Sequence, residues 1–288
     1  PKRVRQARVN IGESEDKTTI MHVSDTHLGY ENREKTGRES TVSWMRDRSS
    51  YENIDLITQI ATERDVDAIV HTGDILDHEV DQETLDITEA LLIKLSKADT
   101  PINCIIGSHD HDSANPQHPD SANGIQWLKS QIKKGRLTEL STNPTAIAGS
   151  SIDAFGISAG NVGINDVGKY QSREWAPSDI SFSTASSGPN ILCLHDGVTP
   201  YRTHDADVDL NQLLTRSRVS FDLVMVGDEH RPKNNDFENG YIFQTDNGTP
   251  VIYTGPAMRI SEPYQDQDAF VTEISITNSD IETTRHLI

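Results

Sequence analysis

The first half of the chain alternates apolar runs with amphipathic segments. Three apolar runs, rich in β-branched residues, predict strands at 18–25 ("TTIMHVSD"), 66–74 ("VDAIVHTGD") and 101–110 ("PINCIIGSHD"). Helical spacing of apolar residues occupies 51–65, 82–98 and 122–135. Ile54, Ile57 and Ile60 share one face of the first of these helices, and Gly135 closes the last. A β-α-β-α-β order is typical of a mainly parallel sheet flanked by helices.

The second half is rich in strands. Apolar runs predict them at 150–158, 190–196, 221–230, 240–245, 250–255, 269–277 and 281–288. The Gly/Asn/Ser-rich stretch 159–189 is expected to be an irregular surface segment. Residues 1–17 show no apolar periodicity, so 1–18 is expected to be a flexible leader before one domain over 19–288. The pattern predicts two stacked sheets with helices outside.

Charge adds information about the environment of the protein. The formal net charge is −19 over 288 residues, of which 34% are hydrophobic. Molar salt would screen this self-repulsion, because the Debye length then falls to about 3 Å. The composition favours a halophilic source, an archaeon with a high-salt cytoplasm, over a merely acidic protein. No basic stripe indicates a nucleic-acid surface, so a DNA substrate would need to be held by something other than surface lysines.

Cysteine content and hydropathy indicate the cellular compartment of the protein. Cys104 and Cys193 both lie in apolar runs, and we expect two buried core residues rather than a disulfide. No apolar stretch approaches the roughly 20 residues that span a bilayer. We therefore expect a cytoplasmic protein that does not contact a membrane.

Candidate chemistry lies at the carboxyl ends of five predicted strands. The residues are Asp25, His27, Asp74, His109, His195, Asp228 and His230. In open α/β sheets, loops converge at this edge to form a site. Any one of these endings alone is more often a turn with a surface histidine, but five in register are hard to explain as turns. Imidazole and carboxylate without thiolate fit manganese, iron or zinc used for hydrolysis.

The order D-x-H, G-D, G-x-H-D, H and G-x-x-H resembles the signature of the calcineurin-like metallophosphoesterases. The strings "HVSDTHLGY", "DAIVHTGDILD" and "TPVIYTGPAMRISE" are more narrowly similar to the Mre-eleven/SbcD family of DNA double-strand-break repair nucleases. The resemblance implies an α/β fold, a four-layer α-β-β-α sandwich of two mixed sheets flanked by helices. It covers residue 20 to the end, without an obvious capping or ATPase-binding domain. Ser108 and Asp228 depart from the family, which has asparagine and histidine there.

The resemblance also implies roles for the residues. One metal would be held by Asp25, His27 and His230. The other would be held by His195 and the residues at positions 108 and 228, with Asp74 bridging. His109 would be catalytic, steadying the scissile phosphate or protonating the leaving oxygen. The substrate candidates, in a basic loop that lies near DNA in the family, are Arg33, Arg38 and Arg48. The cofactors would be two divalent metal ions, manganese before magnesium or iron.

Both departures fall on the second metal. Ser108 offers a weak neutral ligand while Asp228 adds negative charge, so this site should favour manganese or magnesium over zinc. The opposing interpretation is a decaying site with little turnover.

The predicted function is metal-dependent hydrolysis of DNA phosphodiester bonds, as exonuclease and endonuclease in DNA repair. The alternatives are a phosphoesterase for cyclic or mononucleotides and a non-catalytic DNA-end-binding scaffold. The expected partners are DNA, a Rad-fifty/SbcC-type ATPase and a second copy of the chain.

Overall fold

The computed structural model describes residues 8–10, 17–30, 50–77, 80–97, 99–112, 124–159, 180–185, 187–199, 208–230, 242–258, 269–277 and 280–288. The helices are α2 (Ser50–Glu63), α3 (Gln82–Lys97), α4 (Ser108–Asp112), α5 (Gly124–Lys133), the short 3-10 helix η1 (Ile147–Gly149) and α6 (Leu210–Arg216). The strands are β1 (Arg8–Asn10), β2 (Thr18–Val23), β3 (Ala68–Thr72), β4 (Ile102–Ile105), β5 (Thr138–Glu139), β6 (Thr145–Ala146), β7 (Asp153–Ile157), β8 (Asn190–His195), β9 (Val198–Thr199), β10 (Val208–Asp209), β11 (Leu223–Gly227), β12 (Ile242–Gln244), β13 (Pro250–Tyr253), β14 (Phe270–Ile276) and β15 (Asp280–Leu287).

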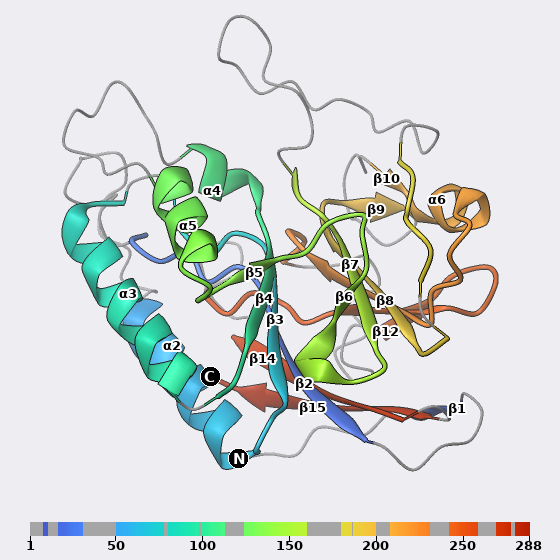
Figure 1. Ribbon diagram of the computed structural model, residues 1–288, viewed down its shortest axis with the longest axis horizontal. Helices are drawn as coiled ribbons and strands as arrows, with labels where there is room; N and C mark the ends of the chain where they lie inside the picture. Colours follow the sequence, from blue (N-terminus) through green and yellow to red (C-terminus); the bar gives the residue numbers. More distant parts are fainter. Residues whose placement is uncertain are drawn as a thin grey trace, which may run out of the picture.

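Two mixed sheets form the centre of the protein (Figure 1). The first has seven strands in the order β1-β15-β14-β2-β3-β4-β5, and the second has six in the order β12-β13-β11-β8-β7-β6. Neighbours from β2 to β5 pair in parallel, and so do those from β13 to β7. The remaining strands, at the sides of each sheet, pair antiparallel. Each sheet therefore has a parallel centre whose strands end at a common edge.

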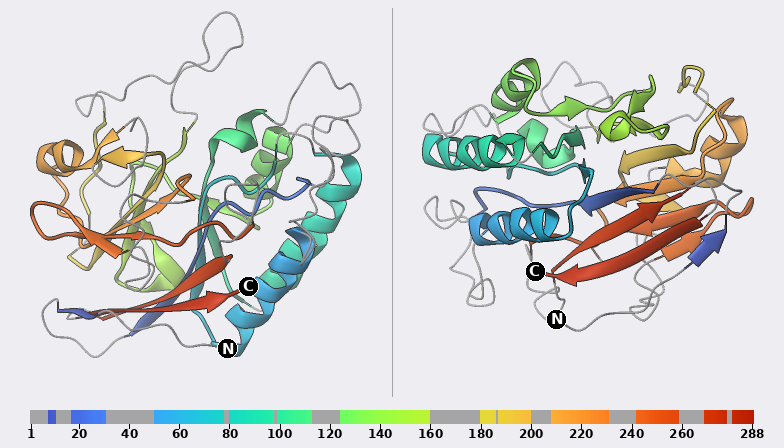
Figure 2. Two further views of the ribbon diagram at one scale, coloured as in Figure 1. Left: turned by 180° about the vertical axis from the view of Figure 1, so that it is seen from behind. Right: turned by 60° about the horizontal axis from the view of Figure 1, so that its bottom comes forward.

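The helices lie outside the two stacked sheets (Figure 2), and three apolar layers of side chains hold these elements together. One joins α2, α3 and α5 to the first sheet, one lies between the sheets, and one joins the second sheet to α6. The alternation along β8 explains the second and third layers, since Ile191 and Cys193 belong to the layer between the sheets and Leu192 and Leu194 to the layer under α6. The predicted four-layer α-β-β-α sandwich of two mixed sheets is thus confirmed.

Several local predictions are also confirmed. On α2, Ile57 is buried, and Ile54 and Ile60 pack against the same cluster. Cys104 and Cys193 are free, buried core residues. Within the described ranges, every helix is too short or too polar to cross a bilayer.

The structure corrects the sequence prediction in three places. Three residues of the predicted flexible leader form β1, the edge strand that pairs with β15, while most of 159–189 lies outside the described residues. The predicted strand 101–110 ends at Ile105, and α4 begins at Ser108. The reason is local: the Asp110 carboxylate accepts a hydrogen bond from the Gly107 amide at 2.8 Å, as in a helix capping box. The short helix α6 was not predicted, although Asp209 caps it by accepting from the Gln212 amide.

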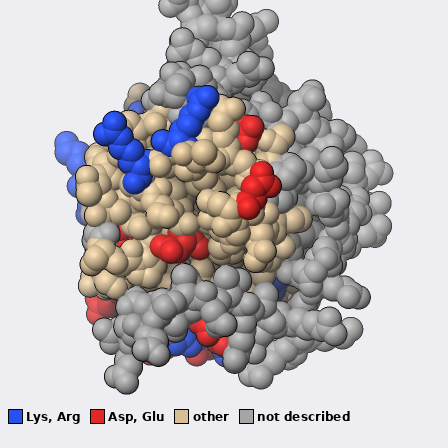
Figure 3. Space-filling model, turned by 90° about the vertical axis from the view of Figure 1, so that its right-hand side faces the viewer, with Lys and Arg blue, Asp and Glu red and all other residues tan. Residues whose placement is uncertain are grey.

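Charge on the face nearest α6 is dispersed. Figure 3 shows this face, where the described part of the chain presents separate basic and acidic side chains among uncharged ones. Neither sign forms a continuous patch among the residues coloured there. The described part of this face therefore offers no basic stripe for a nucleic acid.

Candidate metal centre

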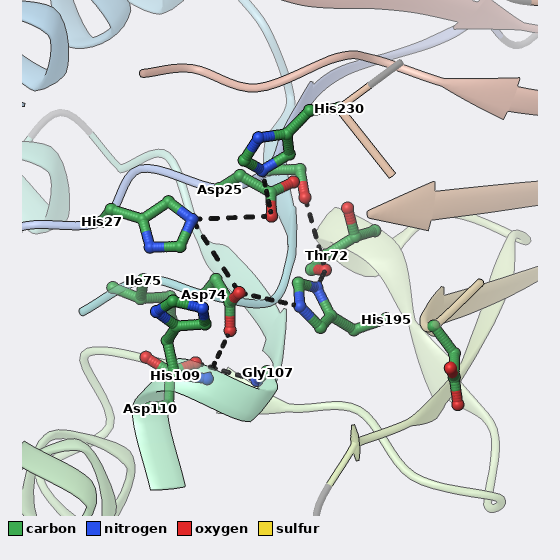
Figure 4. Close-up of polar contacts among 12 residues, drawn as sticks. Asp25, His27, Thr72, Asp74, Ile75, Gly107, His109, Asp110, His195 and His230 are labelled. Atoms are coloured by element: carbon green, nitrogen blue, oxygen red, sulfur yellow. Dashed lines mark hydrogen bonds and ion pairs between the residues drawn. The ribbon is translucent and has the colours of Figure 1, made fainter. Parts of the chain in front are cut away.

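The two sheets bring their parallel strand ends together at one site (Figure 4). The first sheet contributes the loop after β2, the loop after β3 and the start of α4. The second contributes the last residue of β8 and the loop after β11. The residues placed there are Asp25, His27, Asp74, Asp77, His109, His195 and His230. Five of the seven lie beyond a strand of the first sheet by only a few residues, so the parallel register itself sets their spacing.

A first group consists of Asp25, His27 and His230. Their donor atoms lie within 4.8 Å of one another, and all three residues are buried. His230 Nε2 is 3.3 Å and His27 Nε2 is 3.9 Å from Asp25 Oδ1. Because His230 follows β11 and the other two follow β2, this group joins the two sheets.

A second group consists of Asp25, Asp74 and His195. His195 Nε2 is 3.1 Å from Asp74 Oδ2, and His27 Nε2 is 3.9 Å from the same oxygen. Asp74 therefore faces an imidazole from each group. The other ring nitrogen of His195, Nδ1, lies 2.5 Å from the Thr72 carbonyl oxygen, to which it donates, and this leaves Nε2 directed at the site.

Asp77 lies between two imidazoles. Its Oδ1 is 3.1 Å from His109 Nδ1 and 3.4 Å from His27 Nδ1. The His27 and His109 rings meet edge to face, with centroids 4.6 Å apart. The His109 side chain is 22% exposed, whereas those of His27, His195 and His230 are at most 8% exposed. His109 is therefore the imidazole of the site best placed to meet a substrate from solvent.

The backbone is bent sharply at the positions that carry these groups. Asp25, His27, Asp74 and Asp228 have φ values of 54°, 40°, 53° and 68°, in the left-handed region that non-glycine residues seldom adopt. Such strain persists where surrounding structure enforces it, and it clusters at functional sites. The residue types and the conformation therefore point to the same place.

Asp74 lies so close to the backbone at position 107 that only glycine fits there. A methyl group at Gly107 would overlap the carboxylate and the amide nitrogen of Asp74. The His109 amide donates to Asp74 Oδ1 at 2.8 Å, and the Asp110 carboxylate accepts from the amides of Leu76 and Gly107, each at 2.8 Å. The turn into α4 thus holds the Asp74 carboxylate directly.

Burial and charge set the protonation of the acidic groups. Burial raises the pKa of Asp25, but the hydrogen bond and charge of His230 outweigh it and bring the pKa down to about 2. Burial likewise opposes ionisation of Asp74, yet the charge of His195 lowers its pKa further. For Asp110, burial first and then the charge of Asp74 raise the pKa to about 7, against two backbone hydrogen bonds. Asp25 and Asp74 are therefore ionised at neutral pH.

The imidazoles respond to the same carboxylates. Burial lowers the pKa of His195 and His230, but Asp74 and Asp25 respectively raise both pKa values above the ordinary value. For His27, burial dominates and lowers the pKa. Binding of a metal ion would displace the protons that His195 and His230 hold.

The side chains fit divalent metal ions. Asp25 Oδ1, His27 Nε2 and His195 Nε2 are buried and have no hydrogen-bond partner of good geometry among the described residues. Buried polar atoms without a hydrogen bond are destabilising unless something else satisfies them. Imidazole and carboxylate donors suit manganese, iron or zinc, and two groups that share Asp25 and face Asp74 suit a pair of ions.

The remaining sequence candidates are placed differently. Asp228 belongs to neither donor group, although its charge adds to the effect of Asp74 and Asp25 in raising the pKa of His195 and His230. Ser108 is the first residue of α4 and is partly exposed. Arg33, Arg38 and Arg48 lie outside the described residues.

Two features of the site were not predicted from the sequence: the backbone carbonyl that orients His195, and the membership of Asp25 in both donor groups. The Thr72 carbonyl, which orients His195, carries no sequence signal. That Asp25 belongs to both groups follows only from how the sheets meet. Asp77 and Asp110 were recognisable as carboxylates near ligand positions, and the contacts described above show what each one binds.

The protein also has a hollow of about 650 Å³ that lies away from these groups. It is lined by the loops that precede β3, β4 and β5, including Asp67, Asp99 and Arg136. These loops are at the amino ends of the strands, so the hollow occupies the opposite edge of the first sheet from the candidate metal centre.

A two-sheet sandwich with buried imidazole–carboxylate groups at its strand ends defines a class, the dinuclear-metal phosphoesterases. Residues 18–232 match the family model described as calcineurin-like phosphoesterase. The chain belongs to this family, which confirms the family resemblance predicted from the motifs.

Curated relatives are similar over most of this chain. The "DNA double-strand break repair protein Mre11" of Haloferax volcanii is 28% identical over 251 residues, which cover 86% of this chain and 47% of that protein. The proteins of the same name from Methanosarcina acetivorans and Halobacterium salinarum are 26% and 24% identical, covering 74% and 92% of this chain and 30% and 60% of theirs. The chain thus spans about half the length, or less, of two of these three relatives.

Solved structures share the fold at low identity. A dimetal phosphatase from Danio rerio aligns with a TM-score of 0.51 at 11% identity, covering 93% of this chain and 98% of that one. A protein from Thermus thermophilus aligns with a TM-score of 0.50 at 11% identity, over 91% of this chain and all of its own. At this identity the likeness concerns the fold alone.

Proposed function

We propose that this protein hydrolyses DNA phosphodiester bonds with the help of two divalent metal ions, as a nuclease of double-strand-break repair. The observation that carries the proposal is the pair of donor groups at the meeting of the two sheets, joined by Asp25 and faced by Asp74. The similarity to proteins named for double-strand-break repair supports DNA as the substrate.

The metal ligands follow from the two groups. Asp25, His27 and His230 would hold one ion. Asp74 and His195 would hold the other, with Asp25 shared and with Ser108 and Asp228 as further candidates. Two bound ions, with manganese first and magnesium or iron as alternatives, would polarise the scissile phosphate and generate a hydroxide nucleophile near neutral pH.

His109 has the geometry of a proton donor. Its Nδ1 faces Asp77, so a substrate atom would meet Nε2, and its side chain is the most exposed imidazole of the site. Asp77 orients the His109 ring by the same contact. We assign to His109 the protonation of the leaving sugar oxygen.

At high salt, we expect DNA to bind through the metal centre more than through lysine and arginine side chains on the surface. Phosphate contacts made by lysine and arginine weaken steeply as salt rises. With a net charge of −19, the chain attracts DNA poorly at long range. We therefore expect affinity for DNA to fall more when Mn²⁺ is removed than when salt is raised.

Two protein partners remain predictions from the family resemblance. They are an ATPase of the Rad-fifty/SbcC type and a second copy of the chain.

The decisive experiment compares two substrates side by side, labelled duplex DNA and bis-nitrophenyl phosphate, with Mn²⁺ in molar potassium chloride. Cleavage of both, lost with a chelator and in Asp74→Asn, is expected. Cleavage of the nitrophenyl ester alone would replace the nuclease with a small-molecule phosphoesterase. Cleavage of neither, with Mn²⁺ measurably bound, would leave a DNA-end-binding scaffold.

A further inference from the structure

Two more histidines lie behind the metal-binding groups, on the central strands of the first sheet. His22 on β2 and His71 on β3 are 0% and 6% exposed. His22 Nε2 is 2.9 Å from Thr72 Oγ1 on β3, and His71 Nε2 is 3.1 Å from Thr26 Oγ1 in the loop after β2. The imidazole on β2 therefore contacts a threonine hydroxyl on β3, and the imidazole on β3 contacts one in the loop after β2.

The contact of His71 has a defined direction. The Thr26 hydroxyl donates its proton to the Ile75 carbonyl oxygen at 2.9 Å. Since a hydroxyl has one proton, Thr26 Oγ1 must accept from His71, whose proton therefore lies on Nε2. Burial lowers the pKa of His71 to about 4, so the ring is neutral at physiological pH. His71, Thr26 and Ile75 thus form a relay of two hydrogen bonds between the loops after β2 and β3.

This relay holds the residue between two ligand candidates. Thr26 is flanked by Asp25 and His27, both with left-handed φ values. Each such conformation costs on the order of 1–3 kcal/mol and needs surrounding structure to maintain it. Backbone bonds from Asp25 and His27 to the loop after β3 provide part of that support, at 3.1 Å each. The relay adds support through the Thr26 side chain.

We propose that His71 is a positioning residue of the metal centre: through Thr26 it holds Asp25 and His27 at the separation at which both face one cation. The inference rests on the proposed metal centre and not on DNA as substrate. Among the described residues, His71 belongs to neither of the two donor groups and not to the cluster of Asp77 with His27 and His109. Its effect on metal binding is therefore indirect.

The test measures Mn²⁺ affinity directly, by electron paramagnetic resonance titration without substrate, in His71→Phe and Thr26→Val. Both variants keep side-chain bulk. His71→Phe removes the hydrogen bond between His71 and Thr26, and Thr26→Val removes both hydrogen bonds of the relay. Loss of a partner that orients ligands typically weakens metal affinity about 10- to 100-fold. His71→Gln and Thr26→Ser keep a donor and an acceptor respectively, and should recover most of the affinity. The double variant His71→Phe/Thr26→Val should be no weaker than the weaker single variant.

Thr88→Val is the matched control. Thr88 is 2% exposed and its hydroxyl bonds to Thr84 within α3, so the variant removes a buried threonine hydroxyl far from the centre. It should bind Mn²⁺ as the wild type does.

Wild-type Mn²⁺ affinity in folded His71→Phe and Thr26→Val, with only the melting temperature lowered, would overturn the proposal. If His71→Phe does not fold, Thr26→Val carries the test alone. A wild-type protein that binds no Mn²⁺ would overturn both the metal centre and this inference. Intact Mn²⁺ binding without DNA cleavage would count against the nuclease only.

Discussion

The two halves of the candidate centre are supported in different ways. The half at the ends of β2, β3 and β4 is held by contacts within its own sheet, such as the Asp110 carboxylate on the turn into α4 and Thr26 between two strained residues. The half at the ends of β8 and β11 is held from the opposite sheet, where His195 meets Thr72 and Asp74 and His230 meets Asp25. Metal binding should therefore depend on local bonds in the first half and on packing between the sheets in the second.

The largest effect is expected where the halves meet, at Asp74. Asp74→Asn keeps the shape of the side chain but removes the charge that faces His195 and His27. We expect kcat to fall at least about 1000-fold, which corresponds to about 4 kcal/mol. The measurement is hydrolysis of bis-nitrophenyl phosphate with Mn²⁺, together with bound metal per chain. Asp55→Asn, an exposed carboxylate on α2, controls for the change in net charge and should retain full activity. Equal activity in both variants would remove Asp74 from the centre.

Packing between the sheets is tested by two core variants of similar burial. Met225 lies between the sheets, and Leu213 is a buried residue of α6 that packs against the second sheet; they are 0% and 2% exposed. Truncation to alanine should lower the free energy of unfolding by about 2–5 kcal/mol in each case. Only Met225→Ala should also weaken Mn²⁺ binding, because only it loosens the contact between the halves. Chemical unfolding and Mn²⁺ titration decide the question, and the comparison fails if Leu213→Ala weakens binding equally.

Asp77 tests the local support of the first half. Asp77→Asn removes the charge shared by the His27 and His109 imidazoles. Loss of such an orienting carboxylate should lower kcat about 10- to 100-fold. The pH profile of kcat should move as well, because the variant removes the negative charge 3.1 Å from His109 Nδ1. A changed melting temperature with an unchanged pH profile would reduce Asp77 to a packing role.

The two departures from the family pattern, Ser108 and Asp228, test metal preference. If Asp228 makes the second site more anionic, Asp228→His with Ser108→Asn should raise the preference for Zn²⁺ over Mn²⁺ about tenfold, or about 1.4 kcal/mol. Competition titrations of the two metals measure it. A large gain in turnover with Mn²⁺ would instead indicate that the natural site has decayed.

The smallest effect is expected far from the centre, where Glu273 on β14 pairs with Arg64 and His286. Burial raises the pKa of Glu273, but the hydrogen bonds to Arg64 and His286 lower it overall. A carboxyl with a lowered folded pKa stabilises the protein above its unfolded pKa, and this is lost as the pH falls through the folded value. Glu273→Gln should reduce stability by at most about 1 kcal/mol at pH 7, since Arg64 is 42% exposed.

Its pH dependence and its metal binding provide the check. The difference in unfolding free energy between wild type and Glu273→Gln should shrink below about pH 4.3, the ordinary pKa of glutamate. Mn²⁺ affinity should not change. A difference that grows in acid, or a loss of Mn²⁺ binding, would contradict the assignment of Glu273 to a purely structural contact away from the centre.

The sequence by itself determined the order of elements, the stacking of two sheets and the strand ends that carry Asp25, His27, Asp74, His109, His195 and His230. These follow from local signals, the period of apolar residues and the polar residues that end each run. It did not predict α4. This short helix begins with a hydrogen bond from the Gly107 amide to the Asp110 carboxylate, and the period of apolar residues does not reveal such a bond.

Only the tertiary structure decided which donors face one another. That Asp25 meets both His230 and His195, and that Thr72 orients His195, depends on how closely the two sheets approach. This approach is set by the summed packing of side chains distant in sequence, such as Val70, Cys193 and Met225, and no local pattern encodes it.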